Sequence, residues 1–266
     1  MPHIDGHAAG EFCWFELATN DQAGAKRFYG ALLGWAARDN PMGPNFTYTS
    51  FLLEDRDCAA AYTLMPDMLA KGIPPHWMIY VQVADADAVA AKCAELGGAV
   101  ISPPMDVMDF GRMSVLQDPT GAVISVWQPK THKGTLITGV PSTFCWGELS
   151  SAQPEKAVPF YEALFGWKTM RGDNPGDNYL HITAGKLMIG GVVPVEHRDP
   201  NMPSHWLSYF AVSDCDSAAA KANELGGKVI FGPMSMEKVG RMAYVADPQG
   251  AIFALFQPET SAQSGN

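Results

Sequence analysis

The chain has 266 residues and a formal net charge of −10, and 47% of its residues are hydrophobic while 17% are charged. This composition is typical of an ordered globular protein and excludes an intrinsically disordered one. No cluster of Lys and Arg favours nucleic acid or an anionic membrane surface as a partner. No apolar run approaches the length of a membrane span, and the N-terminal stretch lacks the pattern of a signal peptide, so a cytoplasmic location is expected.

The sequence contains a long internal repeat. FYGALLGW returns as FYEALFGW, ELGGAVI as ELGGKVI, and DPTGAVISVWQP as DPQGAIFALFQP. A period of about 130 residues is too long for a solenoid and has the size of an ordinary domain. We therefore predict two tandem domains at residues 8–130 and 142–259, a polar linker at 131–141 and a frayed tail at 260–266.

In chain order, the first repeat opens with a strand at residues 12–17 and continues with a helix. Asn20 or Asp21 is the expected cap of this helix, its apolar positions follow the i, i+3, i+4, i+7 spacing of one helix face, and Gly34 ends it. The second repeat has the same helix, ending at Gly166. Pro159 lies inside it and is a candidate for a kink in its first turns.

Alternating apolar stretches after this helix, FTYTSFLLE and CAAAYTLMP, predict strands of an antiparallel meander. After KGIPP the pattern restarts with the strand HWMIYVQV and a helix that Asp85 caps and Gly97 stops. Three strands follow, and a type I turn at Asp118 is expected between the last two. Each half is thus strand, helix and three strands, written twice.

This order of four βαβββ modules resembles the vicinal oxygen chelate superfamily, which includes glyoxalase I, extradiol dioxygenases, fosfomycin resistance enzymes and bleomycin resistance proteins. The most specific matches are FY…LLGW and FY…LFGW, ELGG, and DPTGA and DPQGA, and the resemblance covers both halves. It implies an α+β fold in which two tandem domains have curved, cup-like mixed sheets that enclose the ligand. The chain is also similar to tandem-domain members described only as glyoxalase-like or hydroxylase-like.

The resemblance also implies where a metal would bind. Enzymes of the superfamily hold a divalent ion with His, Glu or Gln from a module's first strand and Glu from its last strand. The corresponding positions in this sequence are Trp14, Met78 and Ser125 in the first half, and Trp146, Leu207 and Ala254 in the second. Only Ser125 is even a weak ligand, and the fourth position, near 61–63 and 191–193, offers no carboxylate or imidazole. We therefore expect no metal or other cofactor.

Two repeated pairs of polar residues leave a partial metal site open as an alternative. Glu16 and Glu148 lie two residues after Trp14 and Trp146 on the same strand face, and His76 and His205 precede Met78 and Leu207 by two. Two ligands are fewer than zinc ordinarily takes from a protein. Otherwise each histidine is a half-exposed residue at the beginning of a strand, or lines the ligand site.

The two glutamates are the best candidates for chemistry. A carboxylate inside an apolar strand is costly to bury unless it is paired or functional. We expect Glu16 and Glu148 to face inward, to be hydrogen-bonded, and to have a raised pKa. Either could act as a general base or as a polar anchor for a ligand.

Arg112 and Arg241 each follow a glycine at the start of a strand. They could bind a carboxylate or phosphate of a ligand at the cup rim. The favoured interpretation is a salt bridge to a local acid, Asp118 or Asp247.

Aromatic residues gather where the cups are expected. They are Trp14, Tyr80 and Trp127 in the first half and Trp146, Tyr209 and Phe256 in the second. Such stripes usually belong to a core, but an apolar, aromatic-lined hollow with few polar groups is also typical of a ligand site. Cys13 and Cys145 precede two of these tryptophans and are expected to be buried structural thiols, because five cysteines without a CxxC motif predict no disulfide framework.

The sequence favours a protein that binds a small hydrophobic or aromatic molecule in its cups without the usual metal. The alternative is a glyoxalase-type lyase or a dioxygenase-like enzyme that uses a non-standard metal site or Glu16 and Glu148 as general base. A structural protein whose cups are filled by side chains is the third interpretation. Pairing of modules within one chain makes a monomer plausible and leaves a homodimer open.

Overall fold

The computed structural model describes residues 3–44, 46–172 and 178–259. The first half contains these elements in chain order: β1 (Phe12–Thr19), α1 (Gln22–Leu33), β2 (Ala36–Gly43), β3 (Phe46–Leu53), β4 (Arg56–Thr63), α2 (Pro66–Ala70), β5 (His76–Gln82), α3 (Ala86–Glu95), β6 (Ala99–Val107), β7 (Gly111–Gln117) and β8 (Val123–Pro129).

The second half repeats this series, except that a short 3-10 turn takes the place of α2. Its elements are β9 (Phe144–Ser150), α4 (Pro154–Phe165), β10 (Lys168–Arg171), β11 (Leu180–Ala184), β12 (Leu187–Val192), η1 (Val195–His197), β13 (His205–Ala211), α5 (Cys215–Glu224), β14 (Lys228–Met236), β15 (Gly240–Ala246) and β16 (Ile252–Pro258).

Each half forms one curved, mixed sheet of eight strands. The order is β2-β3-β4-β1-β5-β8-β7-β6 in the first sheet and β10-β11-β12-β9-β13-β16-β15-β14 in the second. The first strands of the two modules, β1 and β5, pair antiparallel in the middle of the sheet, while each pairs in parallel with the last strand of its own module. The predicted series of βαβββ modules is therefore confirmed.

The local signals in the sequence act as predicted at most element ends. The Asp21 carboxylate accepts a hydrogen bond of 2.8 Å from the Gly24 amide and caps α1. Gly34 ends this helix with φ of 72°, a left-handed conformation that favours glycine. α4 is continuous through Pro159. β2 was not predicted from the sequence, because most side chains of this strand are exposed and its sequence has no alternation of apolar and polar residues.

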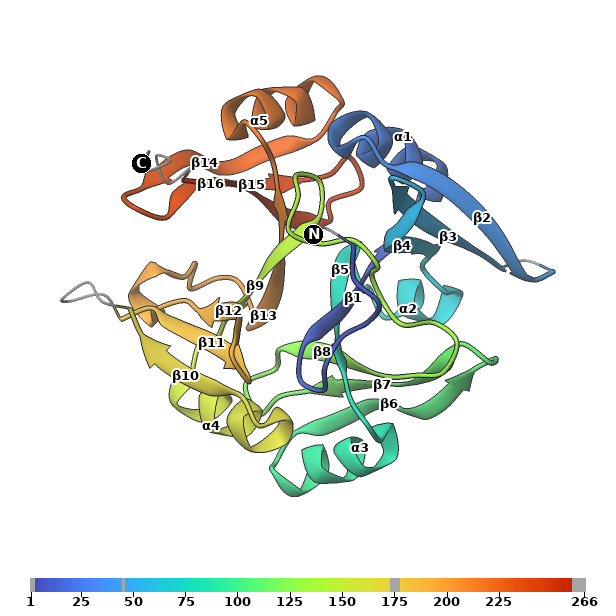
Figure 1. The fold of residues 1–266 in the computed structure, drawn as a ribbon, viewed down its shortest axis with the longest axis vertical. Coiled ribbons are helices and arrows are strands. Elements are labelled where there is room, and N and C mark those ends of the chain that lie inside the picture. The colour runs from blue at the N-terminus through green and yellow to red at the C-terminus, as the bar shows by residue number, and fades with distance from the viewer. Residues whose placement is uncertain (1–2, 45, 173–177, 260–266) are drawn as a thin grey trace.

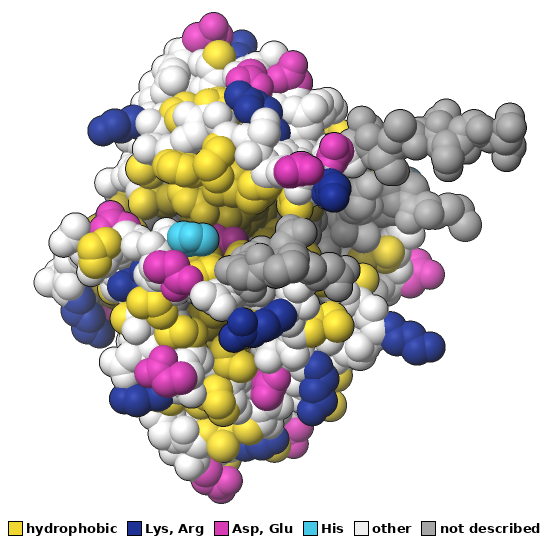
Figure 2. Space-filling view, turned by 90° about the vertical axis from the view of Figure 1, so that its left-hand side faces the viewer, with side chains coloured by type: hydrophobic (Ala, Val, Ile, Leu, Met, Phe, Trp, Pro, Cys, Tyr) yellow, Lys and Arg dark blue, Asp and Glu magenta, His cyan; other side chains and the backbone are white. Residues whose placement is uncertain are grey.

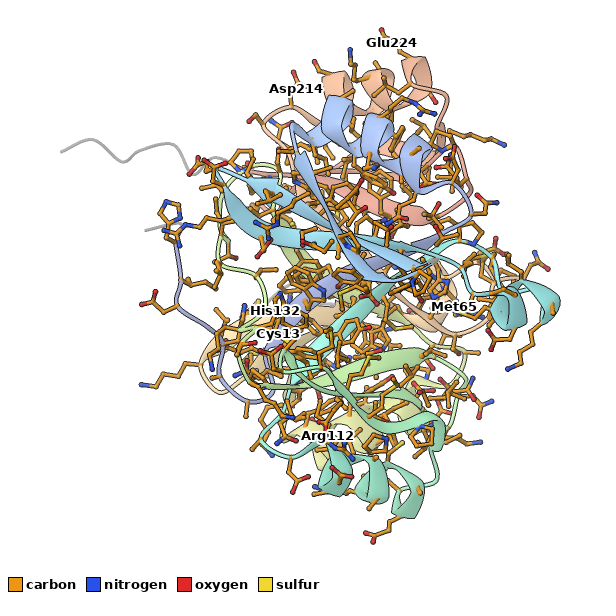
Figure 3. All side chains as sticks on the ribbon, turned by 90° about the vertical axis from the view of Figure 1, so that its right-hand side faces the viewer. Cys13, Met65, Arg112, His132, Asp214 and Glu224 are labelled. Atoms are coloured by element: carbon orange, nitrogen blue, oxygen red, sulfur yellow. The ribbon has the colours of Figure 1, made fainter. Side chains whose placement is uncertain are left out.

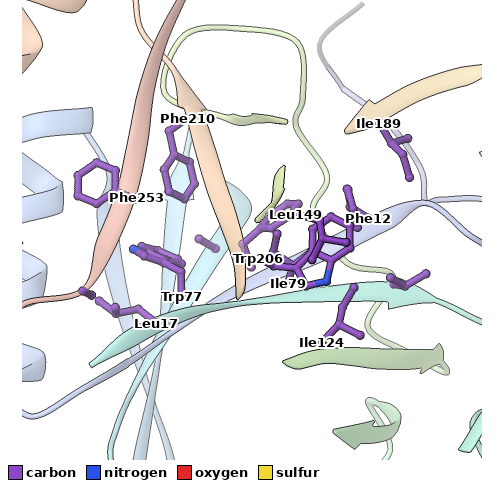
Figure 4. Close-up of a cluster of buried hydrophobic side chains, with 14 of the residues drawn as sticks. Phe12, Leu17, Trp77, Ile79, Ile124, Leu149, Ile189, Trp206, Phe210 and Phe253 are labelled. Atoms are coloured by element: carbon purple, nitrogen blue, oxygen red, sulfur yellow. The ribbon is translucent and has the colours of Figure 1, made fainter. Parts of the chain in front are cut away.

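The convex faces of the two sheets pack against each other. A single cluster of buried hydrophobic side chains contains members from both halves, among them Phe12, Trp77, Trp206 and Phe253 (Figure 4). The ring of Phe15 in this cluster stacks on the partly buried ring of Phe144 from the other half, with their centroids 3.6 Å apart. The two concave faces consequently open on opposite sides of the molecule (Figure 1).

Helices of one half also contact helices of the other. α1 lies beside α5, and α3 lies beside α4 (Figure 1). The Tyr29 hydroxyl in α1 donates a 2.9 Å hydrogen bond to Asp247 of the second half and accepts one of 3.0 Å from the Trp77 indole. The repeated FY and DP motifs thus meet at the contact between the halves.

The segment predicted as a polar linker is packed against the first sheet. Ile137 is buried, and the Thr135 amide donates a hydrogen bond of 2.8 Å to the Cys13 carbonyl oxygen. The Leu136 carbonyl oxygen in turn accepts a bond from the Ile4 amide. Apolar and backbone groups of this predicted linker therefore have partners in the first half that its composition did not indicate.

Within the part of the chain that the structure describes, no helix is both long and apolar enough to cross a bilayer.

The Tyr29→Phe variant should lose about 1–3 kcal/mol of unfolding free energy, because it leaves the buried Asp247 carboxylate and the Trp77 indole without this partner. Urea unfolding monitored by fluorescence measures the loss. Tyr62→Phe is a matched control, since the partly exposed Tyr62 hydroxyl makes no hydrogen bond to a described residue. Equal stability of Tyr29→Phe and wild type would contradict this role.

Candidate functional site

The concave face of each sheet carries a separate cluster of apolar side chains around one glutamate. We call these faces the first cup and the second cup. The first cup includes Trp14, Glu16, Tyr48, Met78, Tyr80, Met113 and Trp127. The second cup includes Trp146, Glu148, Tyr179, Leu207, Tyr209, Met242, Tyr244 and Phe256.

Glu16 lies in the middle of the first cup. The Tyr80 hydroxyl donates a 2.6 Å hydrogen bond to its Oε2, and Tyr48 also bonds to the carboxyl group. The Tyr48 hydroxyl itself accepts a 2.8 Å bond from the Trp14 indole. Burial raises the pKa of Glu16, while the two phenol hydroxyls oppose that shift. The expectation of an inward-facing, hydrogen-bonded carboxyl is confirmed.

Glu148 occupies the equivalent place in the second cup and is held by three tyrosines. Its Oε2 accepts a bond of 2.9 Å from Tyr179, and its Oε1 accepts bonds of 2.7 Å from Tyr209 and 3.1 Å from Tyr244. The Trp146 indole donates to the Tyr179 hydroxyl at 2.8 Å, as Trp14 does to Tyr48. Only 7% of Glu148 is exposed, and burial again raises the pKa of its carboxyl group.

The chemistry of each cup follows from these shifts. Burial also raises the pKa of Tyr80 and Tyr209 well above the ordinary value, so the phenols keep their protons and remain hydrogen-bond donors. Each cup therefore presents hydroxyl and carboxyl groups on an apolar, aromatic surface. Such a surface can orient one polar group of an otherwise hydrophobic molecule, and a carboxyl with a raised pKa is also suited to proton transfer.

The register of the strands corrects one assignment made from the sequence. Trp14 is level with Tyr80 on β5, and Tyr80 with Ser125 on β8, so Met78 lies beside Glu16 instead. In the second sheet the corresponding row is Trp146, Tyr209 and Ala254, and Leu207 lies beside Glu148. The counting error was two residues along one strand face.

These residues do not fit the divalent ion of the superfamily. The row across the first sheet consists of an indole, a phenol and the buried Ser125 hydroxyl, and the row across the second ends in Ala254. Among the residues that the structure describes, no three His, Cys, Asp or Glu side chains gather closely enough to hold a metal. Each cup glutamate accepts hydrogen bonds from protonated phenols. These bonds use the carboxylate lone pairs that would otherwise coordinate a metal ion.

The two histidines considered as partial metal ligands, His76 and His205, bond to the backbone of the proline-rich segments that precede them. His76 Nδ1 bonds to the Pro74 carbonyl oxygen at 2.8 Å, and His205 Nδ1 to that of Pro203 at 2.8 Å. Both are partly exposed, and His76 pairs with Ala18 at the end of β1 rather than with Glu16. No hydrogen bond among the described residues joins either imidazole to a cup glutamate.

The predicted acidic partners of the two arginines were wrong. Arg112 binds Asp87 through two hydrogen bonds of 2.6 and 2.8 Å, and Arg241 binds Asp216 in the same way at 2.5 and 2.8 Å. These partners sit in the first turns of α3 and α5, which pack beside β7 and β15. Asp118 and Asp247 are instead buried and accept amide bonds from their own turns.

The aromatic residues named from the sequence do lie on the concave faces. Trp14, Tyr80, Trp127 and Tyr209 are buried, as the core interpretation expected, whereas Trp146 and Phe256 are only partly buried. Cys13 is buried and Cys145 partly so, and both are free thiols. Figure 2 shows a hollow with hydrophobic walls on the side of the molecule that the second sheet forms.

Sequence reasoning missed several polar groups of the cups. Tyr48 and Tyr179 reach the glutamates from β3 and from the residue before β11, and Tyr244 reaches Glu148 from β15. The repeated tyrosine within FTYTSF and DNYLHI was a signal for the first two. Tyr244 has Val115 as its counterpart in the first half, so comparison of the repeats could not identify it.

A groove of about 490 Å³ lies outside both cups, between α4 and the end of β12. Pro154, Val158 and Val192 line it. In the first half Gln22 occupies the same place and bonds to Thr49 and to the Ala61 carbonyl oxygen. The groove touches neither cup glutamate.

A family model described as the Glyoxalase/Bleomycin resistance protein/Dioxygenase superfamily matches residues 7–126 and 146–255. The chain belongs to this superfamily. The two matched ranges coincide with the two eight-stranded sheets, so each sheet is one unit of this fold.

Two curated proteins are similar to this chain over nearly its whole length. A protein of Mycobacterium tuberculosis, CFP32, provisionally named a glyoxylase, is 40% identical over 97% of this chain and 98% of its own. The anthracycline biosynthesis protein DnrV of Streptomyces peucetius is 34% identical over 94% of each chain.

Solved structures agree on the fold at low sequence identity. The 2,3-dioxygenase LapB of Pseudomonas sp. KL28 superposes with a TM-score of 0.64 and 13% identity, covering 98% of this chain and 97% of that one. A Mn(II)-bound glyoxalase from Novosphingobium aromaticivorans has a TM-score of 0.63 and 17% identity, with 94% and 82% covered.

The Glu148→Gln variant tests the raised pKa of this carboxyl. In the unfolded chain the pKa of a glutamate is about 4.3, and burial raises the pKa of Glu148 above its unfolded value. The folded state therefore holds this proton more strongly, so its stability falls as the pH rises from the unfolded pKa through the folded one. Glutamine removes that loss, so the difference in unfolding free energy between variant and wild type should move in favour of the variant as the pH rises above about 4, the unfolded pKa.

Urea unfolding at a series of pH values measures this difference. Glu16→Gln should behave with the same sign, because burial raises the pKa of Glu16 as well. A difference that stays constant with pH, or that moves in favour of the wild type as the pH rises, would show that the carboxyl is not desolvated in the folded state.

Proposed function

We propose that this protein binds a small, planar, hydrophobic or aromatic organic molecule in a cup, and that it does so without the divalent ion of its superfamily. The observation that carries this proposal is the environment of the cup glutamates. Where relatives of known activity would place metal ligands, this chain has an indole, a phenol and a small side chain, and beside them a carboxyl bound to tyrosine hydroxyls.

The polarity of the cups supports an aromatic ligand. Indole, phenol and thioether side chains surround each glutamate, and ring faces and edges favour stacking with another planar system. The hydroxyl groups of the tyrosines can exchange hydrogen bonds with a carbonyl or hydroxyl group on the ligand. The name of DnrV, an anthracycline biosynthesis protein, supports the same class, because an anthracycline is a fused-ring aromatic compound carrying such groups.

A second candidate is a lyase of the glyoxalase type that uses a cup glutamate as base. The raised pKa of Glu16, together with its partial exposure, favours this function. Abstraction of a proton beside a carbonyl group needs a well-placed carboxylate with such a pKa. The provisional glyoxylase name of CFP32 points to the same class of reaction.

The partners and location follow the same reasoning. A net charge of −10 without a basic cluster disfavours nucleic acid, so we propose a small molecule as the only partner that the cups serve. Intramolecular pairing of the two halves makes a monomer sufficient, and a cytoplasmic location fits the free thiols.

The wild-type protein should bind a planar aromatic compound such as a hydroxylated anthraquinone, with quenching of tryptophan fluorescence because Trp14 and Trp146 lie in the cups. Saturation at a hundred times the dissociation constant should stabilise the fold by about 2.7 kcal/mol and raise its melting temperature. Fluorescence titration and thermal shift measure the two effects. Arg112→Ala is the control and should bind as wild type does, since Asp87 already occupies its guanidinium.

Elemental analysis of the purified protein separates the candidates. A stoichiometric divalent ion, or turnover of a methylglyoxal–thiol adduct that Glu16→Gln abolishes, would replace the binding function with the enzymatic one. A panel of planar aromatic compounds in which none raises the melting temperature would refute the binding function.

A further inference from the structure

The two cups differ at several matched positions, and three of these positions on the walls share one trend. In each pair the second cup has the larger, ring-bearing side chain. The pairs, matched by strand register to the cup glutamates, are Phe231 and Ser102, Tyr244 and Val115, and His181 and Ser50. The duplication has therefore diverged where a ligand would touch the walls.

One wall of the second cup is aromatic and accessible. Phe231 is 45% exposed, and its ring centroid lies 5.7 Å from that of Tyr244. Met234, on the same strand, is 41% exposed. Large apolar side chains left open to water on a concave surface are typical of a binding site.

The opposite wall contains an imidazole without a complete set of partners. The ring of His181 lies 5.3 Å from Tyr179 and 6.0 Å from Trp146, edge to face with each. Its Nδ1 is buried and has no hydrogen-bond partner among the described residues. A buried polar atom in this state is costly, and rotation of the imidazole toward the cup would let a hydroxyl or carbonyl group of a ligand satisfy it.

Tyrosine side chains cover the Glu148 carboxyl group at the floor of the second cup. All three tyrosine hydroxyls point to Glu148, which is only 7% exposed. A ligand would therefore meet the partly buried rings of Tyr179 and Tyr244 rather than a free carboxylate.

The first cup is filled from one end by the segment that connects the two halves. The imidazole of His132 lies 4.5 Å from the Trp14 ring and 5.8 Å from the Trp127 ring, edge to face with both. The Trp127 indole donates a 3.0 Å hydrogen bond to the His132 carbonyl oxygen. Figure 3 shows His132 beside Cys13 on this side of the molecule. Glu16 remains partly exposed, but the aromatic surface around it is already covered.

We propose that the second cup alone is the ligand site. A planar aromatic molecule lies between the wall of Phe231 and Tyr244 and the wall of His181 and Tyr179, and directs a hydroxyl or carbonyl group to the imidazole of His181. The first cup is a structural copy that His132 fills. This assignment rests on the proposed binding function and deepens it.

Isothermal titration with a water-soluble dihydroxyanthraquinone sulfonate tests the assignment. The wild type should bind one molecule per chain. Phe231→Ser and Tyr244→Val install the residues of the first cup, and each should weaken binding about tenfold or more. The matched changes in the first cup, Ser102→Ala and Val115→Ala, should leave the stoichiometry and the affinity unchanged. Thermal unfolding of each variant without ligand confirms that it is folded.

The outcomes separate this assignment from the function on which it rests. Two sites per chain of similar affinity, or a loss confined to the first-cup variants, would overturn the assignment while the binding function stands. Absence of binding to the wild type by this compound and by a panel of planar aromatics would refute the binding function and the assignment together. His181→Phe keeps a ring but removes both nitrogens, and should weaken binding of the dihydroxyanthraquinone sulfonate; an affinity equal to that of the wild type would overturn the role of the imidazole.

Discussion

The chemistry of this protein depends on a carboxyl group buried in each cup and held there by phenol hydroxyls. An uncompensated carboxylate on an apolar sheet would cost several kcal/mol. Tyr80 and Tyr209 supply the compensating donor from the neighbouring strand, and Tyr48 and Tyr179 supply a second donor that a tryptophan indole orients. The same arrangement occurs in both halves, so it was present before the halves diverged or was required in each.

The strand register decides which groups meet in each cup. Here the register brings Trp14, Tyr80 and Ser125 to one row, and the polar groups satisfy one another. The Mn(II)-bound glyoxalase and the dioxygenase LapB share the fold at 17% and 13% identity, a level at which the fold persists while the site changes.

The position of the cups follows from the contact between the halves. Because the sheets pack convex face to convex face through Phe15 and Phe144, the concave faces must open in opposite directions. Across this contact α1 lies beside α5 and α3 beside α4, and the Tyr29 hydroxyl donates a hydrogen bond to Asp247. Each half therefore contributes to a shared core, whereas the side chains of each cup come from one half, and Phe231, Tyr244 and His181 have smaller counterparts in the first cup.

The sequence by itself determined the duplication, the βαβββ order, the helix end at Gly34, and the inward-facing Glu16 and Glu148. These depend on local signals and strand alternation, which act over a few residues. Only the tertiary structure decided which tyrosines reach the glutamates, that Arg112 pairs with Asp87, and that the His132 ring lies against Trp14. Those contacts join residues far apart in the chain, and they depend on strand register and packing, which no local pattern encodes.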